Sequence, residues 1–280
     1  MRKIAPDEYS VFTKYIVDIS GIALGKGKEY LIETRLNPIL VELGCASFAE
    51  LYHRARTDLT KTIEKKIIDA ISTNETYFFR DGSPFELLQH KIIPDLIDKR
   101  TAGLKKTDPV PIRIWSAASS TGQEIYSIAI VLKELYLDPK RFQIRLLGTD
   151  ISGAAIAQAS YGRYNKFEIS RGLTPPKIKK FFNPDGDSYR IKDELRAMVI
   201  FRKLNLTESF IGLGKFDIIL CRNVAIYFSP AERKRLYEKI ATVLEPDGYL
   251  MIGSTESLTS DTGLFEPQKY LRAVFYQFKR

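Results

Sequence analysis

The sequence predicts a doubly wound α/β domain with a small inserted β-subdomain, preceded by an all-helical domain. From residue 110 onward, short β-rich runs alternate with helical stretches, which is typical of a parallel sheet with helices on both faces. Before that point, apolar residues recur at helical spacing. The 280 residues, of which 44% are hydrophobic and 28% charged, are sufficient for one large domain and a smaller companion.

The first hundred residues are expected to form helices. Gly21 and Gly44 would end the first two helices, and Ser47 is a plausible N-cap of the third. The helical pattern breaks over residues 73–85, and Pro94 predicts a kink or break in the helix that follows. The expected helices cover residues 6–20, 27–44, 47–56, 59–72 and 84–100.

These patterns divide the chain into three parts. Residues 1–80 are expected to form the helical domain, and residues 81–108 a linker with one helix, since its end is polar and contains proline. Residues 109–280 are expected to form the α/β domain. An insert at about 163–200 carries the turn signal Asn-Pro-Asp-Gly, which predicts a hairpin or a helix with a hairpin.

Six β-rich runs predict the strands of the sheet. No helix follows the last run, so the C-terminal tail is expected to add one antiparallel strand at an edge. Trp115, in the first run, is expected in the core. The runs cover residues 112–117, 144–150, 199–206, 216–223, 249–254 and 269–280.

Composition and charge argue against several classes of protein. No apolar run is as long as a membrane span and the N-terminus lacks a signal-peptide core, so a cytoplasmic protein without membrane insertion is expected. Cys45 and Cys221 lie far apart in the sequence, which argues against a disulfide framework. His53 and His90 are the two histidines, and so few possible ligands argue against a metal site.

The net charge is +9, and residues 163–203 hold 11 Lys/Arg against 5 Asp/Glu. That surplus is either a solvated face or a docking surface for an acidic partner.

Polar residues follow three predicted strands at the edge where open α/β sheets bind ligands. The first strand leads into SAASSTGQE, the second ends in Asp150, which can accept both hydroxyls of a ribose, and a later one ends in Arg222 and Asn223. The loop has one glycine, Gly122, whereas a dinucleotide fold needs G-x-G-x-x-G beside the pyrophosphate. A cofactor without phosphates needs less bare backbone, which favours S-adenosylmethionine (SAM). Ala118 is expected to be tolerated in this loop with a negative φ.

The stretch WSAASSTGQEIYSIAI (115–130) resembles the W-S-A-G-C-S-T-G-E-E-P-Y-S-x-A block of the chemotaxis receptor methyltransferases, the CheR family. The segments NETYFFRD, LLGTDIS, CRNVAIYF and LEPDGYLMIGSTESL resemble the same family, and the resemblance covers nearly the whole chain. It implies SAM-dependent methylation of glutamate side chains in the cytoplasmic helical domain of bacterial chemoreceptors. The products would be γ-methyl esters and S-adenosylhomocysteine (SAH).

Matching the family's motifs position by position implies a set of site residues. Asp150 would accept the ribose hydroxyls, Glu124 the methionyl ammonium, and Arg80 would hold the carboxylate end of SAM or the substrate glutamate. Arg80 and Tyr227 are the expected catalytic residues, with Tyr227 near the methyl group. The plainer alternative for Asn74, Thr76 and Arg80 is that they cap the helical domain where it meets the sheet. The expected cofactor contacts are Asn74, Thr76, Arg80, Ala117, Gly122, Glu124, Asp150, Asn205, Leu206, Arg222 and Asn223.

The insert departs from family members that grip a C-terminal pentapeptide of the receptor, because FFNPDGDSYRI is compact. It resembles the pentapeptide-independent branch, so no pentapeptide tether is expected. A helical receptor segment would dock between the helical domain and the sheet. Arg35, Arg54 and Arg56 are candidate contacts there, or else ordinary surface arginines.

Two alternatives to an active glutamate methyltransferase stay open. Ala118, which replaces a glycine of the family pattern, favours a non-catalytic module that binds SAM or SAH and regulates a partner. The isoelectric point of about 9.3 favours a methyltransferase for nucleic acid or a small molecule. However, CRNVAIYF stands where an amino-methylating N-P-P-[FY] motif would lie, so no nucleic-acid partner is expected.

Overall fold

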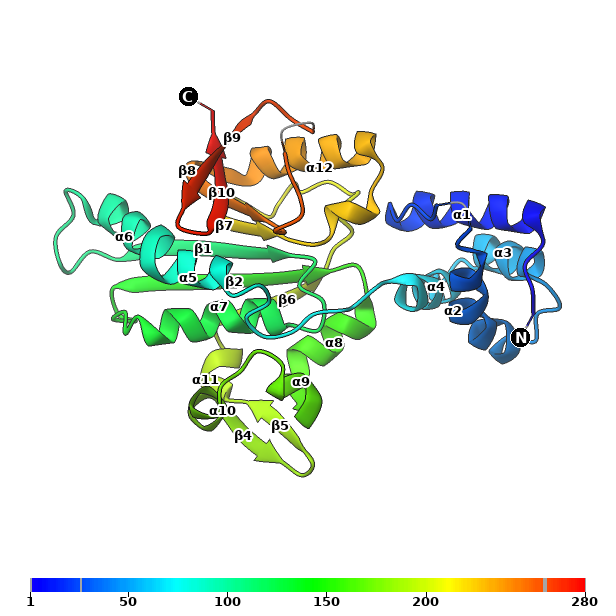
Figure 1. The fold of residues 1–280 in the computed structure, drawn as a ribbon, viewed down its shortest axis with the longest axis horizontal. Helices are drawn as coiled ribbons and strands as arrows, with labels where there is room; N and C mark the ends of the chain where they lie inside the picture. Colours follow the sequence, from blue (N-terminus) through cyan, green and yellow to red (C-terminus); the bar gives the residue numbers. More distant parts are fainter. Residues whose placement is uncertain (1, 26, 259–260, 280) are drawn as a thin grey trace.

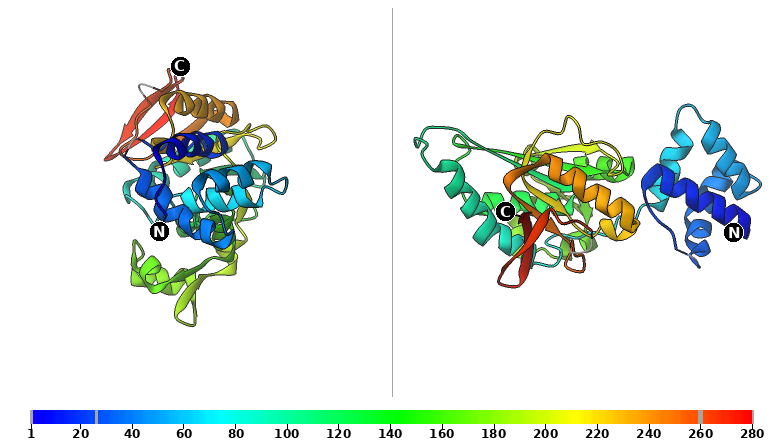
Figure 2. Two further views of the ribbon diagram at one scale, coloured as in Figure 1. Left: turned by 90° about the vertical axis from the view of Figure 1, so that its right-hand side faces the viewer. Right: turned by 90° about the horizontal axis from the view of Figure 1, so that it is seen from above.

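The computed structural model describes residues 2–25, 27–258 and 261–279. Figures 1 and 2 show an elongated molecule with a helical unit at one end, a central sheet covered by helices, and a small β-subdomain beside it. The predicted fold class is therefore confirmed.

Four helices form the N-terminal unit. They pack around a shared apolar core that includes Phe12, Ile16, Leu36, Phe48 and Ile67. The helices are α1 (Pro6–Ser20), α2 (Glu29–Glu42), α3 (Phe48–Thr57) and α4 (Thr62–Ile71).

Local signals set the ends of these helices. The side chain of Ser47 accepts a hydrogen bond from the backbone N–H of Glu50 at 3.1 Å, which confirms the expected N-cap of α3. Gly21 follows α1 with a φ of 76°, the left-handed conformation that glycine adopts without steric cost. Pro38 lies inside α2, which continues past it.

The central sheet has seven strands in the order β6-β2-β1-β7-β8-β10-β9 (Figure 1). The first five of these run parallel, and β10 is antiparallel to both β8 and β9. The strands are β1 (Val110–Ala117), β2 (Phe142–Asp150), β6 (Val199–Lys203), β7 (Phe216–Cys221), β8 (Leu244–Ile252), β9 (Phe265–Tyr270) and β10 (Ala273–Phe278).

The C-terminal tail differs from the expectation of one edge strand. It forms a hairpin that turns at Leu271 and Arg272, so β10 pairs with β8 and β9 takes the edge. The hairpin is closed at its far end by the stacked rings of Phe265 and Phe278, whose centroids lie 5.1 Å apart. This contact joins residues on two strands, which the pattern of a single run does not reveal.

Helices cover both faces of the sheet because successive residues of β1 point to opposite sides. Ile114 joins the core that contains Ile128 of α7 (Gln123–Glu134), whereas Trp115 joins the core that contains Ile240 of α12 (Pro230–Val243). Trp115 is fully buried, which confirms its predicted place in the core.

The helix that precedes the sheet changes type along its length. It consists of α5 (Ser83–Leu87), a π-helical turn η1 (Leu88–Ile92) and α6 (Ile93–Thr101). Pro94 has no N–H to donate to a carbonyl one turn earlier, and the wider π turn precedes it. The break expected at Pro94 is thus a change of helix type, and the chain continues as α6.

The insert follows α8 (Gly153–Tyr161) and forms a three-stranded antiparallel sheet with short helices. The expected hairpin is present, but Asn183, Pro184 and Asp185 belong to its first strand, and the turn is made by Gly186, at a φ of 61°, and Asp187. The strand order is β3-β5-β4. The elements are β3 (Arg163–Asn165), α9 (Lys166–Ser170), α10 (Pro175–Phe181), β4 (Phe182–Asp185), β5 (Ser188–Ile191) and α11 (Asp193–Arg196).

Candidate functional site

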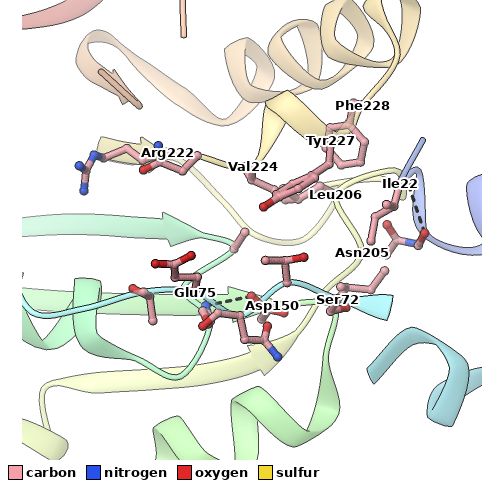
Figure 3. Close-up of a pocket in the computed structure, with 18 of the residues that line it drawn as sticks. Ile22, Ser72, Glu75, Asp150, Asn205, Leu206, Arg222, Val224, Tyr227 and Phe228 are labelled. Carbon is pink, nitrogen blue, oxygen red and sulfur yellow. Dashed lines mark hydrogen bonds between the residues drawn. The ribbon is translucent and has the colours of Figure 1, made fainter. Parts of the chain in front are cut away.

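One pocket lies where the helical unit meets the carboxyl ends of β1, β2, β6 and β7. Its walls come from the end of α1, the segment between α4 and α5 (residues 72–82, called the linker from here on) and the loops that follow the strands. The space between these walls, including the part open to solvent, is about 910 Å³. Figure 3 shows Tyr227 and Val224 on one side of this pocket and Asp150 and Glu75 on the opposite side.

Asp150, the last residue of β2, is held by backbone donors. Its Oδ2 accepts the N–H of Ser120 at 2.9 Å and its Oδ1 accepts the N–H of Ser152 at 2.9 Å. The residue is 6% exposed, and this burial raises the pKa of the carboxyl above its usual range. Each oxygen keeps a second lone pair, so the carboxylate can still accept hydroxyl donors from a ligand.

The loop after β1 has an unusual backbone. Ala118 has a φ of 61°, Ser120 of 50° and Gly122 of 95°. The expectation of a negative φ at Ala118 is therefore wrong. The physical reason is that the loop must turn its N–H groups inward: Ser119 donates to the carbonyl of Thr149 at 2.7 Å and Ser120 donates to Asp150. Ala118 also lines the pocket, where a glycine would leave more room.

A buried arginine links β7 to the linker and to α7. The side chain of Arg222 is 1% exposed, and it donates to Glu124 Oε2 at 2.8 Å and to Asp81 Oδ2 at 2.8 Å. It also donates to the carbonyl of Arg80 at 3.0 Å. Ser116 Oγ donates to Glu124 Oε1 at 2.8 Å. Both oxygens of Glu124 therefore have protein donors, and a ligand ammonium would have to use their remaining lone pairs.

The linker carries three of the expected contacts and is fastened at several points. The carbonyl of Asn74 accepts from Ser120 Oγ at 3.2 Å, and Arg80 Nη1 donates to the carbonyl of Glu75 at 2.9 Å. Glu75 forms an ion pair with Arg171 of the insert at 3.0 Å. The contacts that hold the linker thus come from both the sheet loop and the insert.

Three consecutive aromatic residues of the linker differ in their burial. Phe78 is fully buried, whereas Tyr77 and Phe79 are partly buried. The guanidinium of Arg171 lies 4.3 Å from the ring centroid of Tyr77. At Gly172, a Cβ would lie 1.7 Å from the carbonyl oxygen of Phe78, so the insert packs directly against the linker backbone.

The loop after β6 is fixed by its neighbours. Asn205 Nδ2 donates to the carbonyl of Ile19 at 3.0 Å, and Asn205 Oδ1 accepts the N–H of Thr207 at 3.0 Å. Lys239 of α12 donates to the carbonyls of Leu206 and Glu208. Both ends of the Asn205 side-chain amide thus form hydrogen bonds within the protein, and the backbone of Leu206 is held by Lys239.

The loop after β7 depends on a carboxylate that sequence reasoning missed. Glu256 Oε2 accepts the N–H of Asn223 at 2.8 Å and the N–H of Gly253 at 2.7 Å. Asn223 has a φ of 56°, so Glu256 stabilises an uncommon conformation. The signal was present in GSTES, which belongs to the last family-like segment. Asp81 and Ser120 were also missed as ligands of Arg222 and Asp150.

The structure brings most of the expected site residues to one pocket. Ala117 and Gly122 are not part of its lining: Ala117 is buried in β1, and a Cβ at Gly122 would meet Ala159 at 2.9 Å. The lining includes Asn74, Thr76, Arg80, Glu124, Asp150, Asn205, Leu206, Arg222, Asn223 and Tyr227.

Arg35 and Arg54 have partners within the helical unit. Arg35 Nη1 donates to the carbonyl of Ile71 at 2.5 Å and Nη2 donates to Thr73 Oγ1 at 3.2 Å, so this side chain holds the end of α4. Arg54 pairs with Glu50 on α3. Arg56 is exposed on the same helix.

Two family models account for nearly all of the chain. They are "CheR methyltransferase, all-alpha domain" over residues 7–72 and "CheR methyltransferase, SAM binding domain" over residues 74–274. The chain belongs to the CheR methyltransferase family. Its cofactor is therefore SAM.

Relatives match over almost their full length. The chain is 38% identical over 279 residues to the "Chemotaxis protein methyltransferase" of Vibrio anguillarum, which spans 99% of this chain and 98% of that protein. It is 37% identical to "Chemotaxis protein methyltransferase 1" of Vibrio cholerae, with the same coverage. It is 38% identical over 264 residues to the "Chemotaxis protein methyltransferase" of Borreliella burgdorferi, with 93% and 92% coverage.

The charges in the pocket of this CheR-family chain fit SAM. Glu75, Glu124 and Asp150 line the pocket together with two cations, Arg80 and Arg222, and Arg222 is already paired with two carboxylates. Such a site suits a ligand with hydroxyls and positive charge and without phosphates. Asp150 would hold the ribose and Glu124 the ammonium.

In the described part of the chain, no helix is long and apolar enough to cross a membrane.

Proposed function

We propose that this protein transfers a methyl group from SAM to glutamate side chains of bacterial chemoreceptors and forms γ-glutamyl methyl esters. The observation that carries the proposal is the pocket between the helical unit and the sheet, where Asp150 and Glu124 face the same space as Arg80 and Tyr227. The relatives named chemotaxis protein methyltransferases support the same substrate class.

The chain has to position the substrate more than it has to activate it. A glutamate side chain is already ionised near neutral pH and needs no general base. SAM supplies an electrophilic methyl group when bound. Arg80 uses one N–H for the carbonyl of Glu75. Its other N–H groups can hold the incoming carboxylate by charge-assisted hydrogen bonds.

Apolar residues would keep water from the reacting carboxylate. Ile22, Leu204, Leu206, Val224 and Phe228 line the pocket beside Tyr227. Because charge is lost when a carboxylate meets a cationic methyl donor, a site with less water favours the transition state. Tyr227 would orient the reacting groups from this apolar side.

The proposal is tested by transfer of labelled methyl from SAM to a receptor cytoplasmic fragment, followed by alkaline release of volatile label. Arg80→Ala should lower kcat/KM by about 10- to 100-fold, because a hydrogen bond to a charged group contributes roughly 1.5–3 kcal/mol. Arg235→Ala, which changes an arginine paired with Glu232 on the exposed side of α12, is the control and should leave transfer unchanged. An alkali-stable label would contradict the ester product.

A non-catalytic module that binds SAM or SAH remains the second candidate. The observation that favours it is Ala118, whose left-handed backbone and pocket-facing position are costly in a cofactor loop. SAH binding without methyl transfer to any receptor fragment would support this function over the enzyme.

We propose that docking uses the basic insert without a pentapeptide tether. Lys177 is paired with Glu134 and Lys180 lies beside the Tyr136 ring, whereas Lys179 is exposed. Charge reversal at Lys179 and Lys180 should therefore raise KM for the receptor and leave SAH affinity unchanged. Reversal at Lys177 would also break an internal ion pair. Micromolar calorimetric binding of a receptor pentapeptide would contradict this mode of docking.

A further inference from the structure

The turn that ends α1, residues 19–23, connects the helical unit to two separate loops of the sheet domain. The carbonyl of Ile19 accepts from Asn205 Nδ2 at 3.0 Å, and the N–H of Ala23 donates to the carbonyl of Tyr227 at 2.8 Å. Figure 3 shows Ile22 beside Asn205 at the edge of the pocket. One turn thus touches a residue of the loop after β6 and a residue of the loop after β7.

Gly21 lies at the centre of this contact, and its neighbours leave no space for a side chain at this position. A Cβ there would lie 2.5 Å from Phe228 Cε1 and 2.6 Å from Thr207 Cγ2. Phe228 directly follows Tyr227, and Thr207 directly follows Leu206. The backbone of the turn therefore packs against both loops, at Phe228, which lines the pocket, and at Thr207, which is next to the lining residue Leu206.

The turn is held by internal hydrogen bonds, so a displacement of the turn would also displace the loops after β6 and β7. The N–H of Gly21 donates to the carbonyl of Val17 at 2.7 Å, and Ser20 Oγ donates to the carbonyl of Ile16 at 2.6 Å. Ser20 Oγ in turn accepts the N–H of Ile22 at 3.1 Å. Ser20 is 2% exposed. These internal hydrogen bonds thus tie Ser20, Gly21 and Ile22 to the last turn of α1 or to one another.

We propose that Gly21 is a positioning residue for the cofactor site. The turn 19–23 sets the places of Asn205 and Tyr227, and the seating of the helical unit thereby determines how tightly the pocket holds the cofactor. The expected effect on cofactor affinity rests on SAM as the cofactor. Only the role of Tyr227 rests in addition on the proposed methyl transfer. The helical unit is then one wall of the cofactor pocket.

The test compares Gly21→Ala with Gly44→Ala in the full chain, with SAH affinity measured by calorimetry. Gly44 is the matched control, since it also ends a helix with a positive φ, 63°, and a Cβ there would meet nothing within 4 Å. Both variants carry similar backbone strain, so Gly44→Ala measures the effect of that strain without the steric contact. Gly21→Ala alone should weaken SAH binding, by about tenfold, which is ~1.4 kcal/mol.

A rescue separates positioning from general destabilisation. Thr207→Ser removes the Cγ2 that a Cβ at position 21 would meet, so the double variant Gly21→Ala/Thr207→Ser should regain part of the lost affinity. Ser20→Ala, which loosens the turn without filling space, should also weaken SAH binding and serves if Gly21→Ala does not fold.

Four outcomes are distinguishable. Unchanged SAH affinity in folded Gly21→Ala, or in Ser20→Ala where the first variant does not fold, would overturn the inference. An equal loss of affinity in Gly44→Ala would overturn it too, because the effect would then be a general one on the helical unit. Failure of the unmodified chain to bind SAH would instead contradict the cofactor, and SAH binding without methyl transfer would contradict the proposed function alone.

Discussion

The two walls of the pocket are stabilised by different physics. The sheet wall is ordered by charge: Arg222 is buried between Glu124 and Asp81, and Asp150 is held by two backbone N–H groups. The helical wall is ordered by shape and backbone hydrogen bonds, with Gly21 pressed against Phe228. Loss of the buried cation Arg222 in the first wall should therefore affect folding and binding together, whereas added volume at Gly21 in the second should affect mainly binding.

The largest effect is expected from Arg222→Met. This change keeps an apolar stem but leaves Glu124 and Asp81 without their cation, and removal of one partner of a buried ion pair costs about 3–5 kcal/mol. We expect a loss of that size in the free energy of unfolding in urea, with SAH binding abolished. Arg235→Met, on the exposed side of α12, should change neither quantity. Equal stability of the two variants would show that the buried pair is not what orders the sheet wall.

Asp150→Asn is expected to act on binding more than on folding. The amide keeps one acceptor oxygen but places an NH₂ group near a backbone N–H, and it loses the negative charge that hydroxyl donors prefer. SAH affinity should fall by about 10- to 100-fold, since hydrogen bonds to charged groups contribute roughly 1.5–3 kcal/mol. Asp138→Asn is the matched control, because Asp138 accepts a backbone N–H at 2.9 Å in an exposed turn. Calorimetry of both variants makes the comparison.

The pH dependence of SAH binding should follow Asp150. Burial raises the pKa of this carboxyl, so it takes up a proton at a higher pH than an ordinary aspartate. Affinity should therefore decline as the pH falls through that raised pKa, and Asp150→Asn should remove the decline. For folding the sign is reversed: a raised pKa in the folded state stabilises at acidic pH, and this contribution is lost as the pH rises. Calorimetry and urea unfolding across mildly acidic pH measure the two trends.

The smallest expected effect is a gain, from Ala118→Gly. Relief of a left-handed alanine should raise the free energy of unfolding by about 1 kcal/mol. SAH should bind a few times more tightly, because a methyl group leaves the pocket lining. The same substitution at Ala157, exposed in the middle of α8, should lower stability by about 0.5–1 kcal/mol instead. A loss of stability in Ala118→Gly would contradict the strain.

The sequence predicted features whose cause is local. Three of these features are the Ser47 cap, the hairpin that turns at Gly186 and the burial of Trp115. They follow from side chains acting on their own neighbourhood or from alternation along one strand. The end of β2 at Asp150 was also visible, because a polar residue after a buried run marks the ligand-binding edge of a parallel sheet. The roles expected for the pocket residues came from the family motifs and stay predictions.

The errors arose where distant segments decide the backbone. Ala118 takes a positive φ because the next residues must reach the carbonyl of Thr149 and the carboxylate of Asp150. The C-terminal tail becomes a hairpin because Phe265 stacks on Phe278 and β10 pairs with β8. Neither requirement can be predicted from the residues that are adjacent in the sequence.

The sequence by itself determined the order of helices and strands, the strand-end carboxylate and the family motifs, because periodicity and turn chemistry act over a few residues. The tertiary structure decided which segments share the pocket. Ile19 and Asn205 are 186 residues apart in the chain, yet a single hydrogen bond joins them at the pocket's edge. Such a contact depends on how the helical unit seats against the sheet, and Gly21 permits that seating because it has no side chain to hold the two apart.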